Sequence, residues 1–260
     1  MSSKEQNEKE NRMIAVVSGK GGTGKTVCSL NLASAFHNMG KNVLLVDADV
    51  EDPNLGINLG IHSPEMSLNH VLEDKADPEE AVHVHDTGLF VMPSSLSVNY
   101  TGTDFQYFSD VMEKQDGYVI ADCGPGINEK LISVLEAADS SIVVTNPIRT
   151  SISGALRVIE LIKEMDTDIE GIVVNNLTSK ELHKEEIKGV TGCDILGSIP
   201  YDSLIDESIT HKRPLLEHSP HSRTSHAFRS IAHNILGEEH EISYTDRLKT
   251  ACHSFYSFFK

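Results

Sequence analysis

Paired cysteines and long apolar runs are both missing from this chain of 260 residues. The four cysteines lie far apart and form no C-x-x-C pair, which is typical of reduced thiols in a cytosolic protein and argues against a zinc or iron–sulfur site. No apolar run reaches the roughly eighteen residues that a membrane-spanning helix needs. The first residues also lack the pattern of a signal peptide. We therefore expect a cytoplasmic protein.

Basic residues are scarce as well. The chain has 22 lysine and arginine residues against 39 aspartate and glutamate residues, a formal net charge of -17. This balance disfavours non-specific nucleic-acid binding by the whole surface, because the phosphate backbone attracts cations. A locally basic stretch could still bind DNA, and one occurs at Lys212, Arg213, Arg223 and Arg229.

Composition divides the chain into three segments. Residues 1–11 are almost wholly polar and charged, so we expect a disordered lead-in. Residues 12–236 are long enough for one large α/β domain. Residues 237–260 begin with a polar spacer and continue as a distinct tail.

Short apolar runs alternate with helical patterns along the domain. Several runs are continuously apolar, as in VLLVD and YVIAD, which is typical of strands buried on both faces of a parallel sheet. The alternation predicts a doubly wound α/β fold, with a mostly parallel sheet of about seven strands, helices on both faces and a ligand site at the carboxyl ends of the strands. The predicted strands are Met13–Ser18, Asn42–Asp47, Leu89–Met92, Tyr118–Asp122, Ser141–Asn146, Gly171–Asn175 and Ile195–Pro200, and the clearest helices are Lys25–Met39, Asn128–Ala138 and Ser153–Met165.

A glycine-rich loop follows the first predicted strand directly. It satisfies the pattern G-x-x-x-x-G-K-[ST] between a strand and a helix, which is a specific signal for a phosphate-binding P-loop. Its glycines allow successive backbone N–H groups to surround phosphate oxygens, and the next helix points its positive end at the same place. We expect Lys25 to reach the β and γ phosphates and the Thr26 hydroxyl to ligate Mg²⁺. The predicted phosphate-binding residues are Gly19, Lys20, Gly21, Gly22, Thr23, Gly24, Lys25, Thr26 and Val27.

A second lysine, Lys20, stands near the start of this loop. With it the loop resembles that of the deviant Walker A ATPases, the MinD/ParA family, and the resemblance covers roughly residues 12–236. In that family the extra lysine crosses a dimer interface and touches the phosphates bound by the partner. The resemblance therefore implies a homodimer that sandwiches ATP, with Lys20 and Lys25 among its catalytic residues. The alternative for Lys20 is a solvated loop charge.

Two acidic segments resemble the family's remaining nucleotide-site motifs. Asp47 and Asp49 form a D-x-D switch followed by an Asn-Leu pair, although Asp52-Pro53 departs from the usual residues there. By resemblance, Asp49 orients the attacking water and Asp47 supports Mg²⁺ through water. Carboxylates suit these tasks because phosphoryl transfer depends chiefly on positioning and charge. A solvated acidic loop is the alternative.

The second acidic segment is Tyr118–Asp122, an apolar strand that ends in an acid, as in the Walker B motif. The resemblance assigns Asp122 to the magnesium shell and Gly124-Pro125-Gly126 to the second switch. Relatives often have Ser-Pro-Ala-Gly where this chain has Cys123-Gly-Pro-Gly126. The aspartate and final glycine are kept, while the hydrolysis rate does not follow from the motif. A strand-end capping role is the alternative for Asp122.

The residues that would contact the base give a weaker signal. Asn175 or Asn176 ends a strand where relatives place an asparagine that contacts adenine, and Pro200–Asp202 lies where they line the base with backbone. Either asparagine could instead cap a turn. No guanine-specific N-K-x-D motif accompanies the P-loop. We therefore expect ATP, with Mg²⁺, as the cofactor.

The tail from Asp246 to Lys260 has an amphipathic helical pattern. Its apolar residues fill one contiguous arc flanked by Arg247 and Lys249, as in a helix that lies on an anionic membrane surface. MinD-like proteins carry such a helix at this terminus, so the resemblance implies a protein that is peripheral on the cytoplasmic face of the membrane. A helix docked on the protein itself is the alternative.

The histidines give no functional signal. Most of them lie irregularly between His211 and His253, which argues against a metal site. His83 and His85 alternate along an extended segment, and we expect both to face solvent.

The motifs indicate nucleotide chemistry without fixing its biological use. The leading interpretation is a slow, partner-stimulated, Mg-dependent ATPase of the MinD-like branch, which recruits an unidentified regulatory protein to position or regulate cell division machinery. A ParA-like DNA-binding partition ATPase is the alternative from a different class. A flagellar-number regulator shares the switches and tail, and a metallocluster carrier would need paired cysteines.

Overall fold

The computed structural model describes residues 11–97, 100, 103–177 and 184–238. These residues form a fold built on one eight-stranded sheet. The strand order is β3-β4-β2-β5-β1-β6-β7-β8, and every neighbouring pair is parallel except β3 and β4. The strands are β1 (Arg12–Val17), β2 (Val43–Ala48), β3 (His83–Val84), β4 (Phe90–Met92), β5 (Tyr118–Cys123), β6 (Ser140–Thr145), β7 (Asp168–Leu177) and β8 (Ile195–Pro200). The predicted doubly wound, mostly parallel fold is confirmed.

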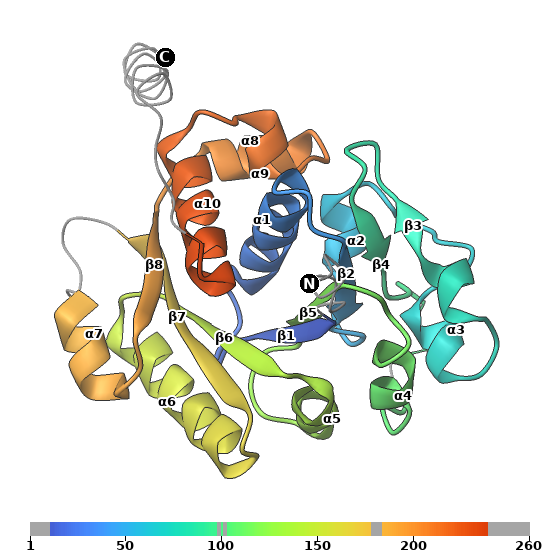
Figure 1. The fold of residues 1–260 in the computed structure, drawn as a ribbon, viewed down its shortest axis with the longest axis horizontal. Helices are drawn as coiled ribbons and strands as arrows, with labels where there is room; N and C mark the ends of the chain where they lie inside the picture. The colour runs from blue at the N-terminus through green and yellow to red at the C-terminus, as the bar shows by residue number, and fades with distance from the viewer. Residues whose placement is uncertain (1–10, 98–99, 101–102, 178–183, 239–260) are drawn as a thin grey trace, which may run out of the picture.

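Helices cover both faces of the sheet (Figure 1). Helices α1 and α10 lie on one face, while α5 and α6 lie on the other. The helices are α1 (Lys25–Asn38), α2 (Leu55–Asn58), α3 (Leu68–Leu72), α4 (Phe108–Met112), α5 (Glu129–Ala137), α6 (Arg149–Glu164), α7 (Lys184–Thr191), α8 (Leu204–Thr210), α9 (Leu215–His218) and α10 (Arg223–Leu236), with a 3₁₀ turn, η1, at Pro78–Ala81.

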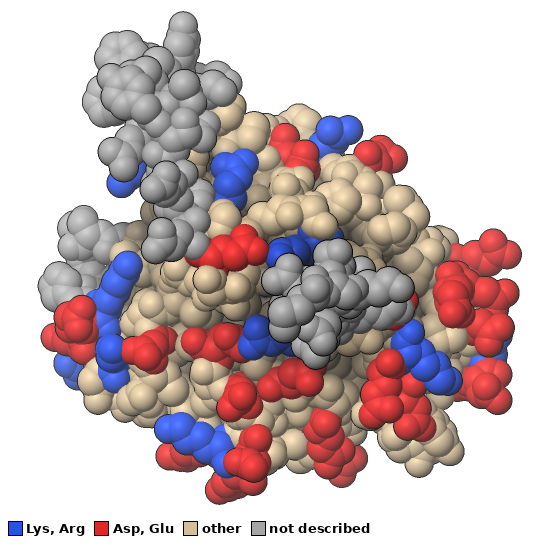
Figure 2. Space-filling view, viewed as in Figure 1, with Lys and Arg blue, Asp and Glu red and all other residues tan. Residues whose placement is uncertain are grey.

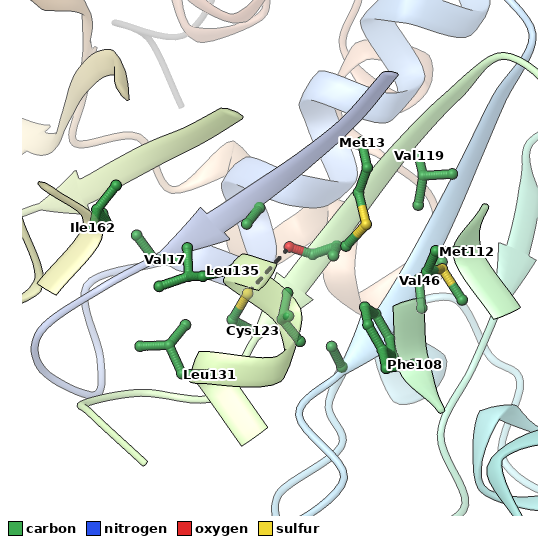
Figure 3. Close-up of a cluster of buried hydrophobic side chains, with 14 of the residues drawn as sticks. Met13, Val17, Val46, Phe108, Met112, Val119, Cys123, Leu131, Leu135 and Ile162 are labelled. Carbon is green, nitrogen blue, oxygen red and sulfur yellow. Dashed lines mark hydrogen bonds between the residues drawn. The ribbon is translucent and has the colours of Figure 1, made fainter. Parts of the chain in front are cut away.

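Two apolar cores hold these layers together, and β1 contributes to both. Met13 and Val17 point into the core under α5 and α6, which Figure 3 shows, whereas Ile14 and Val16 point into the core under α1 and α10. Successive side chains of a strand alternate between the two faces of its sheet, so a strand buried on both faces needs apolar residues at every position. This requirement explains why the central strands are continuous apolar runs.

Strand β3 is the one strand of the described sheet that the sequence pattern did not predict. It has only two residues and pairs antiparallel with β4 at the edge of the sheet. The expectation that His83 and His85 face solvent was wrong. Both are half-buried: the His83 Nε2 contacts the Met66 carbonyl at 2.9 Å, and the His85 Nε2 contacts the Lys212 carbonyl at 3.0 Å.

The ends of the chain fall largely outside the described residues. The predicted lead-in is outside them up to residue 10, and the predicted amphipathic tail is outside them completely. Helix α10 ends at Leu236, where Gly237 adopts a left-handed conformation with φ of 65°. Across the described residues, no helix is both long and apolar enough to cross a membrane.

Candidate nucleotide-binding site

The predicted P-loop connects β1 to α1 at the carboxyl edge of the sheet. Gly22 and Gly24 both adopt left-handed φ values, 76° and 85°, which glycine reaches without the strain that a side chain would impose. Gly24 is further constrained by space, because a Cβ atom there would lie 2.0 Å from the Asn175 Nδ2. The glycines therefore permit the loop to curl at the start of α1, where a phosphate group is stabilised by free N–H groups and by the helix dipole.

The start of the loop packs against α6 without intervening side chains. A Cβ atom added to Gly19 would lie 2.0 Å from the Gly154 carbonyl carbon, and one added to Gly154 would lie 2.9 Å from the Gly19 carbonyl oxygen. The two backbones therefore touch. Gly154 supports the loop although it lies far outside the sequence motif, and no signal in the sequence identified it.

Lys25 is buried at the first position of α1 and pairs with Asp122 at the end of β5. Its Nζ donates to the Asp122 Oδ1 at 3.0 Å. Ser29, one turn further along α1, donates its hydroxyl to the same oxygen at 3.0 Å. Burial alone would lower the pKa of Lys25, but the attraction of Asp122 and its neighbours outweighs burial and raises it. Lys25 therefore stays charged, as a phosphate-binding lysine must.

Asp47 lies beside Asp122 on the adjacent strand. The two aspartates are register partners in the pairing of β2 with β5, and both are almost completely buried. Asp47 accepts the backbone N–H groups of Asp49 and Leu55, each at 3.2 Å. Burial, followed by repulsion from Asp122, raises the pKa of Asp47 well above its ordinary value. A divalent cation at these carboxylates would relieve that repulsion.

Carboxylate and hydroxyl oxygens form the donor set that Mg²⁺ prefers. Asp47, Asp122 and the half-buried Thr26 provide such a set around Lys25, so the residues present fit a bound Mg²⁺–nucleotide. Buried polar atoms support this fit. Three of them adjoin the loop without a hydrogen-bond partner among the described residues: Thr23 Oγ1, Asn146 Oδ1 and Asn175 Oδ1. Such atoms are uncommon in a folded protein unless a ligand or water completes them.

The two predicted switch segments meet at Asp49. This residue is half-buried, and its Oδ1 accepts the Asp52 N–H at 3.3 Å. A Cβ atom at Gly124 would lie 3.2 Å from the same oxygen, so the second switch runs directly past the carboxylate. Burial is the main cause that raises the pKa of Asp49, and the positive charge of Lys25 opposes it. Gly126, with φ of 78°, donates its N–H to the Ser18 carbonyl at 3.0 Å and ties this switch to the P-loop strand.

Lys20 differs from Lys25 in its exposure and in its partner. Its side chain is exposed, and its Nζ lies 3.5 Å from the Thr150 Oγ1 in the first turn of α6. It therefore points along the outer side of its own loop, whereas Lys25 points inward to the acids.

Comparison with known proteins agrees with this geometry. Residues 9–236 match the ParA family described as NUBPL iron-transfer P-loop NTPase. An uncharacterized ATP-binding protein of Methanocaldococcus jannaschii is 34% identical over 234 residues, which cover 88% of this chain and 89% of that protein. The chain belongs to the MinD/ParA family of P-loop ATPases.

Solved structures place this MinD/ParA ATPase near MinD. The cell division ATPase MinD of Pyrococcus furiosus superimposes with a TM-score of 0.83 at 28% identity, covering 87% of this chain and 99% of that one. The septum site-determining protein MinD of Pyrococcus horikoshii, in complex with Mg-ADP, gives a TM-score of 0.81 at 26% identity, covering 92% and 98%. The resemblance stated from the sequence is confirmed at the level of the family and the fold.

The residues proposed for the base lie together at the ends of β7 and β8. Asn176 has a left-handed φ of 55°, and the Tyr201 N–H approaches the Leu177 carbonyl at 3.4 Å, which joins the two strand ends. The Asp202 carboxylate accepts the Thr224 hydroxyl at 2.6 Å and the Leu204 N–H at 3.1 Å. The Asp202 side chain therefore bonds within the protein. The segment from Pro200 to Asp202 would contact a base through its backbone groups.

Proposed function

We propose that this MinD/ParA ATPase is MinD-like: it binds Mg-ATP, dimerises around it, and associates reversibly with the cytoplasmic face of the membrane to position or regulate cell division machinery. One observation carries the proposal. A single P-loop presents two lysines, of which Lys25 is buried among its own acids while Lys20 is exposed on the outer side. An exposed lysine in that place is available to the phosphates of a second subunit.

The chemistry assigned to the chain is electrostatic. Bound Mg-ATP supplies the phosphoryl group that is transferred to water. On binding, Lys25 would exchange Asp122 for the β and γ phosphates, which frees that carboxylate for the metal shell together with Thr26 and Asp47. Asp49 would orient the water, because its carboxylate lies where both switches meet. Positioning and charge stabilisation of this kind account for most of phosphoryl-transfer catalysis.

A DNA-binding role is less well supported. Of the locally basic stretch, the Lys212 Nζ donates to the Ile57 carbonyl at 3.2 Å and the Arg229 guanidinium donates to the Pro220 carbonyl at 2.6 Å. Both cations therefore act within the fold. Figure 2 shows acidic side chains spread between the basic ones on the viewed face, rather than a continuous basic surface.

Cluster transfer and flagellar placement remain alternatives because relatives in the same family serve different processes. The three described cysteines, Cys28, Cys123 and Cys193, are buried, and burial raises the pKa of each thiol, which disfavours the thiolates that a metal cluster needs. Flagellar placement would use the same dimer and tail, so it differs from the proposal only in the partner protein.

Replacing Lys20 with alanine is expected to leave ATP binding intact and to prevent the ATP-dependent dimer. The physical reason is that Lys25, and not Lys20, pairs with Asp122 in the subunit's own site, so the charge of Lys20 would act on the phosphates of a partner subunit. Light scattering with and without Mg-ATP measures the outcome. Arg149→Ala, which removes a neighbouring exposed cation from α6, is the matched control. A Lys20→Ala protein that still dimerises on ATP would refute the role in trans.

The tail is expected to bind anionic vesicles only when ATP joins two subunits. One short amphipathic helix binds a bilayer marginally. Two helices on one dimer bind more tightly, by about 10²-fold or more, because the second insertion is intramolecular. Vesicle co-sedimentation with and without ATP measures this, and deleting Thr245–Lys260 should abolish it while dimerisation survives.

Single substitutions separate the membrane helix from a helix docked on protein. Phe255→Glu places a carboxylate on the apolar arc and should abolish sedimentation with vesicles. Ser257→Glu adds the same charge to the polar side and should retain sedimentation. Equal sedimentation of the two variants would show that the arc does not contact lipid, and the docked-helix alternative would replace it.

A further inference from the structure

Two asparagines outside the P-loop motif hold consecutive carbonyl groups of the loop. Asn175, near the carboxyl end of strand β7, donates its Nδ2 to the Thr23 carbonyl at 2.7 Å. Asn146, directly after β6, donates its Nδ2 to the Gly22 carbonyl at 3.5 Å. Asn175 is only 3% exposed, and Gly24 lies against its amide so closely that no side chain fits between them. The loop is thus tied to two strand ends by side chains of the same chemistry.

The direction of a carbonyl fixes the direction of the next N–H group. A peptide unit is planar and trans, so its C=O and N–H bonds point in opposite directions, and no cis peptide bond occurs among the described residues. Holding the Gly22 carbonyl toward Asn146 therefore turns the Thr23 N–H the other way. Holding the Thr23 carbonyl toward Asn175 does the same for the Gly24 N–H. These N–H groups belong to the part of the loop that encloses phosphate oxygens.

We propose that Asn146 and Asn175 are positioning residues that form an amide clamp on the P-loop, orienting the Thr23 and Gly24 N–H groups for phosphate before nucleotide arrives. The inference rests on the proposed nucleotide binding and names residues that set its phosphate affinity. It gives Asn175 a task at the phosphate end of the ligand, separate from any contact with the base.

The hydrogen bonding of the two side chains indicates that the loop requires their N–H donors. Each amide uses its nitrogen on the loop, and each leaves its Oδ1 buried without a partner among the described residues. A buried acceptor without a partner lowers the stability of the fold. An apolar side chain of similar size would avoid that loss, but it could not hold a carbonyl group.

Asn175→Leu provides the test, because leucine has a side chain of similar branched shape without a hydrogen-bond donor. We expect the affinity for Mg-ATP and the affinity for Mg²⁺ with tripolyphosphate, both measured by isothermal titration calorimetry, to fall by the same factor of about tenfold or more. That factor is typical for loss of one buried hydrogen bond. A residue that only reads the base would weaken ATP binding and leave tripolyphosphate binding unchanged, which would overturn the clamp.

Two further variants test whether a loss of affinity comes from the clamp, and not from misfolding or from any replacement of asparagine by leucine. Asn146→Leu should lower both affinities in the same way but less, because its hydrogen bond is longer, and it keeps the test valid if Asn175→Leu fails to fold. Asn234→Leu is the control. Asn234 lies on α10, and its amide donates to the carbonyl of Leu196, near the start of β8, at 2.9 Å. This control should leave both affinities unchanged.

Amide hydrogen exchange provides a readout that needs no ligand. In the nucleotide-free protein, the peptide covering residues 19–27 should exchange faster in Asn175→Leu and Asn146→Leu than in the wild type or Asn234→Leu. Unchanged exchange would contradict the clamp. Failure of the proposed function can be told apart from failure of the clamp. If the wild type binds neither ATP nor tripolyphosphate, the proposed function is wrong. If the wild type binds both and the variants bind tripolyphosphate as tightly as the wild type does, only the clamp is wrong.

Discussion

Lys25→Ala is expected to lower the affinity for Mg-ATP by at least about 100-fold. Lys25 is the buried cation of the site, and its ammonium group would donate hydrogen bonds to the β and γ phosphates. Charge-assisted hydrogen bonds contribute about 1.5–3 kcal/mol each, so loss of two such contacts removes about 3 kcal/mol or more of binding free energy. Isothermal titration calorimetry measures the affinity, and circular dichroism checks that the variant is folded.

A distant lysine provides the control for Lys25. Lys41 pairs with Glu238 at 3.0 Å, near the amino end of β2 and therefore away from the carboxyl edge where the loop lies. Lys41→Ala removes the same charge from the protein and should bind ATP like the wild type. If folded Lys25→Ala binds ATP as tightly as Lys41→Ala does, the loop is not a phosphate-binding P-loop.

Asp49→Ala is expected to bind ATP normally, hydrolyse it about 100-fold more slowly, and remain dimeric. The carboxylate lies between the two switches, and positioned groups that orient or deprotonate a nucleophile typically contribute rate factors of about 10² or more. The Asp49 carboxylate accepts the Asp52 N–H within its own switch, so we expect its removal to affect hydrolysis more than ATP affinity. Single-turnover hydrolysis, with ATP binding measured in parallel, separates the two effects.

Asp52→Ala is the matched control for Asp49. Asp52 is an exposed acid three residues further along the same switch, and it contacts Asp49 through its backbone N–H, which the substitution keeps. It should hydrolyse ATP at nearly the wild-type rate. Equal single-turnover rates for Asp49→Ala and the wild type would mean that another group positions the water.

The central strands and the P-loop could be predicted because their signals are local. A strand buried on both faces needs a continuous apolar run, and β2 and β5 show such runs. The acids Asp47 and Asp122 could be placed at one site because both end parallel strands, whose carboxyl ends meet at one edge of the sheet. Strand β3 could not be found in this way, because two residues carry no period and their pairing depends on β4.

The supporting residues of the site could not be predicted for a related reason. Ser29, Asn146 and Gly154 contact the Walker B aspartate or the loop only after helices and strands distant in sequence pack together. A serine within α1 or a glycine within α6 can have many structural roles, and the neighbouring sequence does not distinguish Ser29 or Gly154 from other serines and glycines. Asn146 had the strongest available signal, since it follows a buried strand at the edge where the ligand site was expected.

The most direct test of the central claim is the mass of the wild-type protein in solution with Mg²⁺ and a non-hydrolysable ATP analogue. Static light scattering after size-exclusion chromatography should give the monomer mass of 28.5 kDa without nucleotide and with ADP, and twice that mass with the analogue. The dimer should disappear when the analogue is removed. A mass that stays at 28.5 kDa with saturating analogue would contradict the proposal that this ATPase works as a nucleotide-sandwiched dimer.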